Sequence, residues 1–447
     1  MKKNETVVLE ITALNSDGAG VARNDGEVVF VPYALPGETV EALIIKEAKT
    51  YAVGKLTKVL VPSPDRVAPA CPHFFRCGGC DYQHLTYPAQ VKLKSESTLA
   101  NMRKLSGLDL SVGAVIEDDP PYRYRTKAQF PVAVDQENKP VLGFFSARSH
   151  RVIAMDDCLL QSEACNQVIA AVKMALTVCP VPIYDEVAHK GILRHVIARE
   201  GQGGLMVILV TNSEKKLPPA FIDAMKTALP VMKTLVQNVN TQKGNVILGR
   251  VCRVLWGPGF LEDELCGIRF HLRPLAFLQV NPRQAAKLYE TAISLSGLTG
   301  QETVFDAYCG IGVMSLMLAR KCKHLIGVEI VPEAIETAKE SAELNGITNA
   351  EFLVGACEDV LPDLIENGQK PDVLVVDPPR AGCEASLLDA IADAAIQKIV
   401  YVSCNPATLA RDMKILAERG YTCSPLTFVD MFAQTKHLET VVLMSRA

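Results

Sequence analysis

The tetrapeptide Ser403–Pro406, with the sequence Ser-Cys-Asn-Pro, directly follows the apolar run Ile399–Val402, and it constrains the fold more than any other feature of the chain. A short run of β-branched and aromatic residues is typical of a buried strand, and Asn-Pro turns the chain away at once. Ligands of open α/β sheets bind at the carboxyl ends of the strands. We therefore expect a parallel sheet that presents the thiol of Cys404 at its reactive edge.

Another apolar run predicts a strand that ends at the same edge. Val373–Val376 leads directly into Asp377-Pro378-Pro379-Arg380. Because the carboxyl ends of parallel strands meet at one edge, the carboxylate of Asp377 and the thiol of Cys404 are expected to share a crevice.

A glycine-rich turn after the run Thr303–Ala307 indicates a nucleoside cofactor. Gly310 and Gly312 lie in this turn, and the run His324–Val328 ends in Glu329, an acid that can accept both hydroxyls of a ribose. The third glycine of a dinucleotide fingerprint is absent, which favours S-adenosylmethionine over a pyrophosphate. A structural glycine turn with a helix-capping acid is the alternative.

The change of sequence period divides the chain into three predicted parts. Residues 1–60 alternate between polar and apolar, with turns at Asp17–Gly20 and Asn24–Gly26, which predicts a small antiparallel barrel. Residues 61–275 form a β-rich central part with a cysteine-bearing loop. From Asn281, an N-cap followed by proline, strands and helices alternate, so residues 276–447 are expected to form an α/β domain.

Composition bounds the class of protein. The chain has 447 residues, of which 49% are hydrophobic, but its apolar runs are all too short to span a bilayer. We expect a cytosolic monomer without membrane contact. The formal net charge of −4 means that any binding to RNA must come from a local basic surface.

Three of the fourteen cysteines, Cys71, Cys77 and Cys80, share a loop rich in proline, glycine and histidine. Such spacing is typical of ligands, because a reducing compartment disfavours disulfides. Cys158 is the best candidate for a fourth ligand. One compact triple plus a remote thiol favours a cubane iron–sulfur cluster, while zinc and incidental thiols remain alternatives. The spacing differs from the Cys-x3-Cys-x2-Cys of radical enzymes.

Basic residues gather around a predicted hairpin. Binding to RNA and simple exposure of a strand face to solvent explain this cluster equally well. The candidates for RNA contact are Arg123, Arg125, Lys127 and Arg148. Phe277 is either a core residue or a platform on which a base stacks. Glu439, at the start of the last predicted strand, is on pattern alone a strand-end acid exposed to solvent.

Together these residues resemble the RNA uracil-5-methyltransferase family over nearly the whole chain. The resemblance implies a Rossmann-like class I methyltransferase sheet, an OB-like TRAM barrel that binds RNA, and four cysteines that hold a [4Fe-4S] cluster. It makes Cys404 the nucleophile and Glu439 the general base. It also assigns four residues to S-adenosylmethionine, namely Gln279, Tyr308, Glu329 and Asp377. Relatives that carry both TRAM and the cluster act mainly on 23S ribosomal RNA, which favours that substrate over tRNA.

Two rival functions use the same residues differently. An amino-group methyltransferase is suggested by Asp377-Pro378-Pro379, but Arg380 stands where that motif has an aromatic residue, and such enzymes need no thiol. A non-catalytic iron–sulfur RNA-binding protein would be expected to lack Cys404 or Glu329, and both are present. Methylation of uracil C5 through a Cys404–C6 adduct therefore remains the principal hypothesis.

Overall fold

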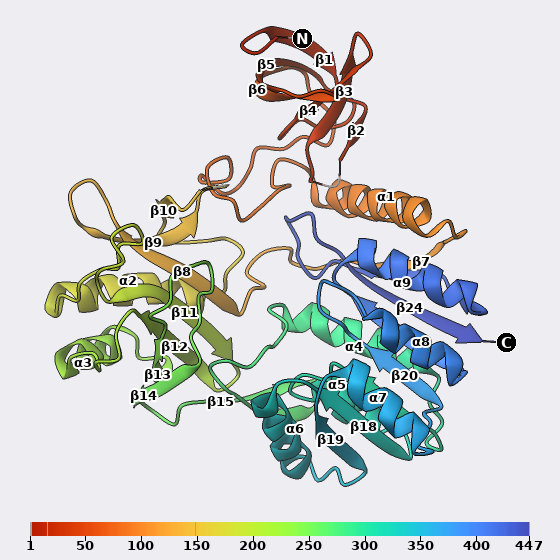
Figure 1. Cartoon of the computed structure of the whole chain (residues 1–447). Helices are drawn as coiled ribbons and strands as arrows, with labels where there is room; N and C mark the ends of the chain where they lie inside the picture. Colours follow the sequence, from red (N-terminus) through yellow and green to blue (C-terminus); the bar gives the residue numbers. More distant parts are fainter. Residues whose placement is uncertain (1, 16, 148, 447) are drawn as a thin grey trace.

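The computed structural model describes residues 2–15, 17–147 and 149–446. Its first strands form one sheet in the order β1-β5-β6-β4-β3-β2. Val29, Val40 and Ile44 are among the side chains that fill its interior. Buried and exposed residues alternate along strands such as β1 and β5, so that one face of the sheet closes around the interior and forms the barrel at the top of Figure 1. The strands are β1 (Thr6–Glu10), β2 (Ala13–Leu14), β3 (Gly20–Asn24), β4 (Glu27–Val31), β5 (Thr39–Glu47) and β6 (Tyr51–Val61).

The central part is a sheet with helices on one face. Its strand order is β10-β9-β8-β11-β12-β13-β14, and α2 (Glu163–Val178) and α3 (Pro219–Ala228) cover one face through a core that includes Val172, Leu209 and Phe221. The strands are β8 (Lys127–Val134), β9 (Pro140–Phe145), β10 (Val152–Ala154), β11 (Leu193–Gly201), β12 (Gly204–Thr211), β13 (Met232–Val239) and β14 (Val251–Trp256).

The carboxyl-terminal sheet has the order β19-β18-β17-β20-β21-β24-β23-β7. The strands from β19 to β21 are parallel, and β24 is antiparallel to the three strands that it pairs with, β21, β22 and β23. The strand order reverses between β17 and β20, and a crevice opens at such a switch point. The strands are β17 (Thr303–Ala307), β18 (His324–Glu329), β19 (Ala350–Val354), β20 (Val373–Val376), β21 (Lys398–Ser403), β22 (Tyr421–Cys423), β23 (Leu426–Val429) and β24 (Glu439–Arg446).

Both faces of this sheet are covered by helices. Val304 and Val373 point into one core, while their neighbours Phe305 and Leu374 point into the other. Both sets are buried, which explains why the strands are continuous apolar runs. The first face carries α4 (Pro282–Ser296), α5 (Val313–Ala319) and α6 (Pro332–Leu344); the second carries α7 (Cys357–Glu366), α8 (Ala385–Asp393) and α9 (Pro406–Glu418).

A hairpin joins the central sheet to the carboxyl-terminal one. It consists of β15 (Leu261–Leu265) and β16 (Ile268–Leu272). Phe270 of this hairpin lies in the same hydrophobic core as Ile208 of the central sheet and Leu288 of α4. The two larger parts therefore share one continuous core.

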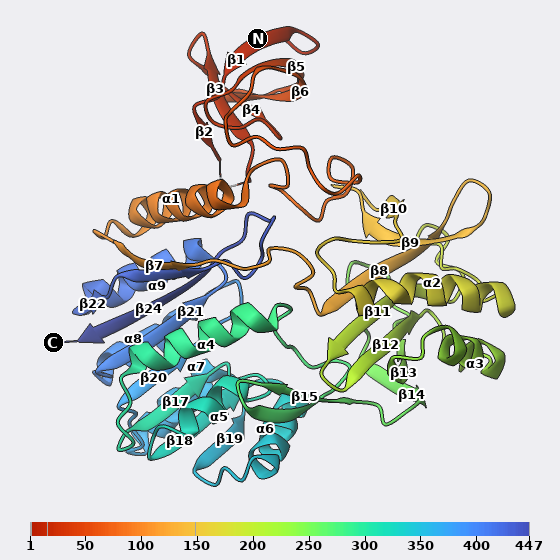
Figure 2. The ribbon, with the colours of Figure 1, turned by 180° about the vertical axis from the view of Figure 1, so that it is seen from behind.

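One segment lies elsewhere than we expected. Helix α1 (Tyr87–Ser106) and strand β7 (Val112–Ile116), which the sequence placed within residues 61–275, pack on the carboxyl-terminal sheet. Strand β7 pairs in parallel with β23, and Met102 of α1 is buried in the core beneath α9. Figure 2 shows α1 lying between the barrel and this sheet. Residues 87–116 thus belong to the carboxyl-terminal unit, although they precede the central sheet in the chain.

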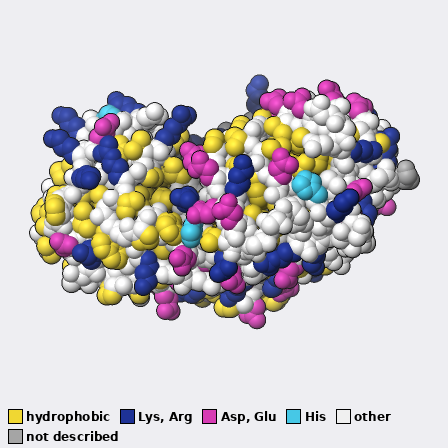
Figure 3. All heavy atoms as spheres, turned by 90° about the horizontal axis from the view of Figure 1, so that it is seen from below, with side chains coloured by type: hydrophobic (Ala, Val, Ile, Leu, Met, Phe, Trp, Pro, Cys, Tyr) yellow, Lys and Arg dark blue, Asp and Glu magenta, His cyan; other side chains and the backbone are white. Residues whose placement is uncertain are grey.

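Two further properties of the structure are the distribution of charge on its surface and the length and polarity of its helices. Basic and acidic side chains are interspersed on the face shown in Figure 3, in keeping with the small net charge. Among the described residues, every helix is too short or too polar to cross a bilayer.

We expect Met102→Ala to destabilise the carboxyl-terminal unit, because Met102 is fully buried there. A cavity of this kind costs about 2–5 kcal/mol of unfolding free energy. Leu105→Ala on the same helix removes a side chain that is 52% exposed, and should change the free energy by less than about 0.5 kcal/mol. Urea unfolding of the two variants measures the difference. Equal stabilities would show that α1 does not pack as described.

Candidate functional site at the carboxyl edge of the sheet

The register between β21 and β24 brings Cys404 and Glu439 together. Ser403 pairs with Thr440 in this antiparallel ladder, so Cys404, the residue that follows β21, comes opposite Glu439, the first residue of β24. Asp377 follows the neighbouring strand β20. The thiol and both carboxylates influence one another electrostatically, as expected for groups within one site. The predicted proximity of Cys404 and Asp377 is therefore present, and Glu439 lies with them at the same sheet edge.

Both carboxyl groups are shifted toward the neutral form. Glu439 is only 3% exposed. Burial, and then the nearby Asp377, raise its pKa to about 8. Burial also raises the pKa of Asp377 to about 7. A carboxylate with a pKa close to the working pH is well matched to accept a proton during catalysis. Glu439 is thus a buried acid and does not face solvent as a strand-end residue would.

Arg380 is the cation of this cluster, and the sequence reasoning did not give it a role. Burial, and then the carboxylates of Glu439 and Asp377, raise the pKa of the Cys404 thiol, whereas the guanidinium of Arg380 lowers it. Arg380 also lowers the pKa of Glu439. The charge of Arg380 therefore favours the thiolate, which is the nucleophilic form. In the sequence, the position of Arg380 three residues after Asp377 could have indicated that it belongs to the same site.

Asn405 connects the two strand-end loops. Its side-chain oxygen accepts a hydrogen bond from the Ala407 backbone amide at 3.2 Å and caps α9, while its Nδ2 donates to the Arg380 carbonyl at 2.8 Å. Asn405 N donates to Ser403 Oγ at 3.1 Å. The turn after β21 is therefore fixed on both sides of Cys404, and the loop that carries Arg380 is held beside it.

The glycine turn after β17 is held by Glu329. One carboxylate oxygen of Glu329 accepts a hydrogen bond from the Gly310 amide at 3.2 Å, and the other accepts one from the Val331 amide at 2.9 Å. Gly310 and Gly312 have φ values of 56° and 82°, which favour glycine. A Cβ built on Gly310 would meet nothing within 4 Å, whereas one on Gly312 would lie 2.8 Å from Ala338 Cβ. Gly312 permits packing, and Gly310 faces open space.

Asp306 is a further acid beneath the turn that we did not single out as a site residue. It is fully buried and accepts a hydrogen bond from Ser315 Oγ, while its Oδ1 is buried and has no hydrogen-bond partner among the described residues. Burial raises its pKa to about 7. A buried orphan oxygen suggests that a ligand completes this site. In the sequence, an acid within the otherwise apolar strand Thr303–Ala307 could have indicated that Asp306 is a site residue.

The loop between β16 and α4 places an aromatic ring at the surface. Phe277 is 68% exposed, whereas Gln279 two residues later is only 8% exposed. The buried guanidinium of Arg199 donates to three carbonyls of this loop, those of Arg273, Pro274 and Ala276, at 3.1, 3.2 and 2.6 Å. Phe277 is therefore not a core residue, and its loop is held in place from β11. Tyr308, with φ of 65°, donates its backbone amide to Cys357 Sγ at 3.3 Å.

The four candidate ligand cysteines line one cavity of about 350 Å³. Gln83 Nε2 donates to Cys80 Sγ at 3.2 Å, and its oxygen accepts from the Cys71 amide at 3.0 Å. In the described part of the chain, no group of three or more His, Cys, Asp or Glu side chains is arranged to hold a metal ion. The structure therefore brings Cys71, Cys77, Cys80 and Cys158 together around a cavity, and the cluster itself stays a prediction.

The basic residues proposed to contact RNA have other neighbours. Arg123 forms two hydrogen bonds with the carboxylate of Asp157, at 2.6 and 2.7 Å. Arg125 and Lys127 line the cysteine cavity, and burial lowers the pKa of Lys127 to about 8. Arg148 lies outside the described residues. Arg125 and Lys127 therefore belong to the wall of the cavity, Arg123 is paired with Asp157, and contact of these residues with RNA stays a prediction.

Two family models match the chain. The TRAM domain matches residues 2–57, which form the barrel, and the model described as tRNA (Uracil-5-)-methyltransferase matches residues 265–447, which contain the site. The predicted TRAM domain at the amino terminus is thus confirmed.

Relatives and a solved structure match over the full length. "Uncharacterized RNA methyltransferase" proteins of Clostridium tetani and Halalkalibacterium halodurans are each 44% identical over 449 residues; they cover 100% and 99% of this chain, and 97% and 98% of their own lengths. The crystal structure of Pyrococcus abyssi tRNA (uracil-54, C5)-methyltransferase in complex with S-adenosyl-L-homocysteine is 26% identical with a TM-score of 0.79, and the match covers 98% of this chain and 100% of that one. With this fold and these relatives, the chain belongs to the RNA uracil-5-methyltransferase family.

Proposed function

We propose that the protein transfers a methyl group from S-adenosylmethionine to C5 of a uridine in 23S ribosomal RNA, through a covalent adduct between Cys404 and C6. The observation that carries this proposal is the register that sets Cys404 opposite Glu439 at the carboxyl edge of the sheet. A thiol nucleophile, a carboxylate with a raised pKa and a cation are what this reaction requires.

The residues around the glycine turn fit the cofactor. Gly310 leaves open space for close approach of a ligand, Glu329 offers a carboxylate to ribose hydroxyls, and Asp306 has a buried oxygen without a partner. The proposed binding residues are Gln279, Tyr308, Gly310, Gly312, Glu329 and Asp377. When bound, S-adenosylmethionine supplies an electrophilic methyl group on a sulfonium. The solved relative that contains S-adenosyl-L-homocysteine supports this assignment.

Cys404 makes the uracil reactive. Its thiolate adds to C6, a C–S bond forms, and the electron pair of the C5–C6 double bond makes C5 a nucleophile. C5 then bonds to the methyl group, whose bond to the sulfonium breaks and leaves its electron pair on sulfur as a neutral thioether. Glu439 then takes the proton from C5. The electron pair of that C–H bond rebuilds the double bond, and Cys404 leaves as a thiolate. Arg380 favours the thiolate at the start and at the end of this sequence.

The target base must leave its stack to reach this crevice, because C5 and C6 are covered in a stacked base. Phe277 lies in the loop that precedes Gln279, and its ring is exposed and available to stack on a base of the RNA. Arg199 holds the backbone of that loop, which keeps the aromatic ring on a fixed support.

The cysteine cavity fits an iron–sulfur cluster better than a single ion. Cys71, Cys77, Cys80 and Cys158 surround one cavity, and a cubane separates its thiolate ligands more than a single ion does. The amide of Gln83 donates to Cys80 Sγ, a contact of the kind that tunes such clusters. We propose that the cluster is structural and joins the loop of residues 71–80 to Cys158.

Transfer RNA is the second candidate substrate. The solved relative is a tRNA (uracil-54, C5)-methyltransferase and matches nearly all of this chain, barrel included, so the architecture alone does not discriminate between the two RNAs. The resemblance to relatives with TRAM and four cysteine ligands supports 23S ribosomal RNA. Mapping 5-methyluridine in both RNAs from a strain that lacks the gene decides between them.

A target RNA that contains 5-fluorouridine is expected to form a stable adduct with Cys404 in the presence of S-adenosylmethionine, because fluorine cannot leave as a cation. Denaturing gel electrophoresis detects the adduct, and fragments of 23S ribosomal RNA and tRNA can be compared directly. Cys404→Ala should form none, whereas Cys309→Ala, which alters the thiol beside Gly310, should still form it. An adduct mapped to another residue would contradict the proposal.

Arg380→Ala should move the pH profile of kcat/KM to higher pH. Arg380 lowers the pKa of both Cys404 and Glu439, so its removal raises both, and the rise of activity with thiol deprotonation should occur at higher pH. Arg380→Lys keeps the charge and should shift the profile less. A profile that stays in place in Arg380→Ala would remove the guanidinium from thiolate stabilisation.

Anaerobically purified protein is expected to contain about four irons per chain, the content of a cubane. Cys77→Ser should lose the iron and weaken RNA binding, because the loop of residues 71–80 is then released. Cys179→Ser, a half-buried thiol outside the cavity, is the matched control and should keep its iron. Elemental analysis that finds one zinc per chain and no iron would overturn the cluster.

A further inference from the structure

The loop between β23 and β24, residues 430–438, is buried although most connections lie at the surface. Asp430, Met431 and Ala433 have no exposed area, and Gln434 is 2% exposed. A buried loop must satisfy its backbone polar groups from within the protein. This loop leads directly into Glu439, the proposed base.

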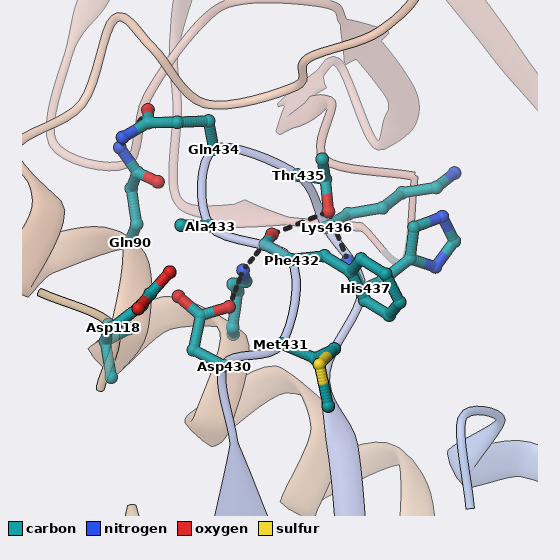
Figure 4. Close-up of polar contacts among 12 residues, drawn as sticks. Gln90, Asp118, Asp430, Met431, Phe432, Ala433, Gln434, Thr435, Lys436 and His437 are labelled. Atoms are coloured by element: carbon teal, nitrogen blue, oxygen red, sulfur yellow. Dashed lines mark hydrogen bonds and ion pairs between the residues drawn. The ribbon is translucent and has the colours of Figure 1, made fainter. Parts of the chain in front are cut away.

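Side chains from other parts of the chain satisfy the carbonyls of the loop. Lys94 Nζ donates to the Phe432 carbonyl at 3.2 Å, and Tyr124 Oη donates to the Ala433 carbonyl at 2.8 Å. Asn281 Nδ2 donates to the Met431 carbonyl at 3.2 Å. Figure 4 shows the loop from Asp430 to His437, with Gln90 beside Gln434 and Asp118 beside Asp430. The loop therefore has its conformation imposed from outside.

The centre of the network is the ion pair of Lys94 with Asp430. Lys94 Nζ lies 2.6 Å from Asp430 Oδ1, and both side chains are almost completely buried. Tyr87 Oη donates to the other oxygen of Asp430 at 2.9 Å and accepts from the Asp118 amide at 2.7 Å. Removing one partner of such a pair leaves an uncompensated buried charge.

The far end of the loop contacts the amino-terminal part. The Gln434 carbonyl accepts hydrogen bonds from the amides of Asp81 and Tyr82, at 2.9 and 3.1 Å. Lys436 Nζ pairs with Asp17 of the barrel at 2.7 Å. These contacts involve the second half of the loop, whereas Lys94 pairs with Asp430, the residue at which the loop begins.

The strand register connects the ion pair to the base. Val429 pairs with Glu439 where β23 and β24 meet the loop, so Asp430 is the first residue beyond that pair. A displacement of Asp430 therefore moves the point at which Glu439 enters β24. A misplacement of about 1 Å can cost about 100-fold in rate, because proton transfer needs hydrogen-bond reach.

We propose that Lys94 and Asp430 are positioning residues that hold Glu439 at the C5 proton of the methylated uracil adduct. This inference rests on the proposed function. The ion pair is buried and acts through the end of the loop. Loss of the pair should slow removal of the proton and leave addition of Cys404 and methyl transfer largely intact.

The test follows the adduct with S-adenosylmethionine labelled in its methyl group. Lys94→Met should lower kcat by about 100-fold, leave KM for RNA within a few fold, and accumulate a labelled protein–RNA adduct on denaturing gels. The double variant Lys94→Met/Asp430→Asn leaves no unpaired charge and keeps an acceptor for Tyr87. It should behave in the same way even if the single variant fails to fold.

Two further variants separate the possible outcomes. Phe221→Ala opens a cavity in the core of the central sheet and contacts no part of the loop; it should lose stability but show normal kcat per folded molecule and no adduct. Glu439→Gln should accumulate the adduct fully. If Glu439→Gln turns over normally, the proposed base is wrong and this inference fails with it. If Glu439→Gln accumulates adduct and the folded double variant does not, this inference alone is overturned.

Discussion

The antiparallel ladder between β21 and β24 is the constraint on which the site depends. It is the ladder that turns two residues 35 positions apart, Cys404 and Glu439, into neighbours at one sheet edge. The parallel strands supply Asp377 and the glycine turn at the same edge, since their carboxyl ends meet there. Cys404, Arg380 and the carboxyl groups of Glu439 and Asp377 then lie close together. Burial raises the pKa of both carboxyl groups, and the nearby Asp377 adds to the rise for Glu439.

The sheet holds this edge rigidly because both of its faces are buried. Helix α1 and strand β7, which come before the central part in the chain, complete one face and one edge of it. The hairpin β15–β16 joins its other face to the central sheet through a shared core. The catalytic unit is therefore built from residues 87–116 together with the carboxyl-terminal part, and α1 lies between this sheet and the barrel.

The buried loop of residues 430–438 relates these parts to the chemistry. Contacts from the barrel, the cysteine loop, α1 and the segment before α4 all converge on it. A loop with this many external hydrogen bonds has little freedom of its own. The residue that follows it, Glu439, is consequently placed by the assembly of the whole chain.

The sequence alone determined the strands, the glycine turn and the residues that follow each strand, because apolar runs, glycines and Asn-Pro act over a few positions. It also determined the TRAM barrel and the family, through motifs spread along the chain. Only the tertiary structure decided that Arg380 lowers the pKa of the Cys404 thiol and that Arg125 and Lys127 line the cysteine cavity. It also decided that Asp306 is buried with one oxygen that has no partner in the part of the chain that the structure describes. It also moved residues 87–116 to the catalytic unit and made Glu439 a buried acid. Burial and charge proximity depend on which distant segments pack together, and local patterns carry no information about that.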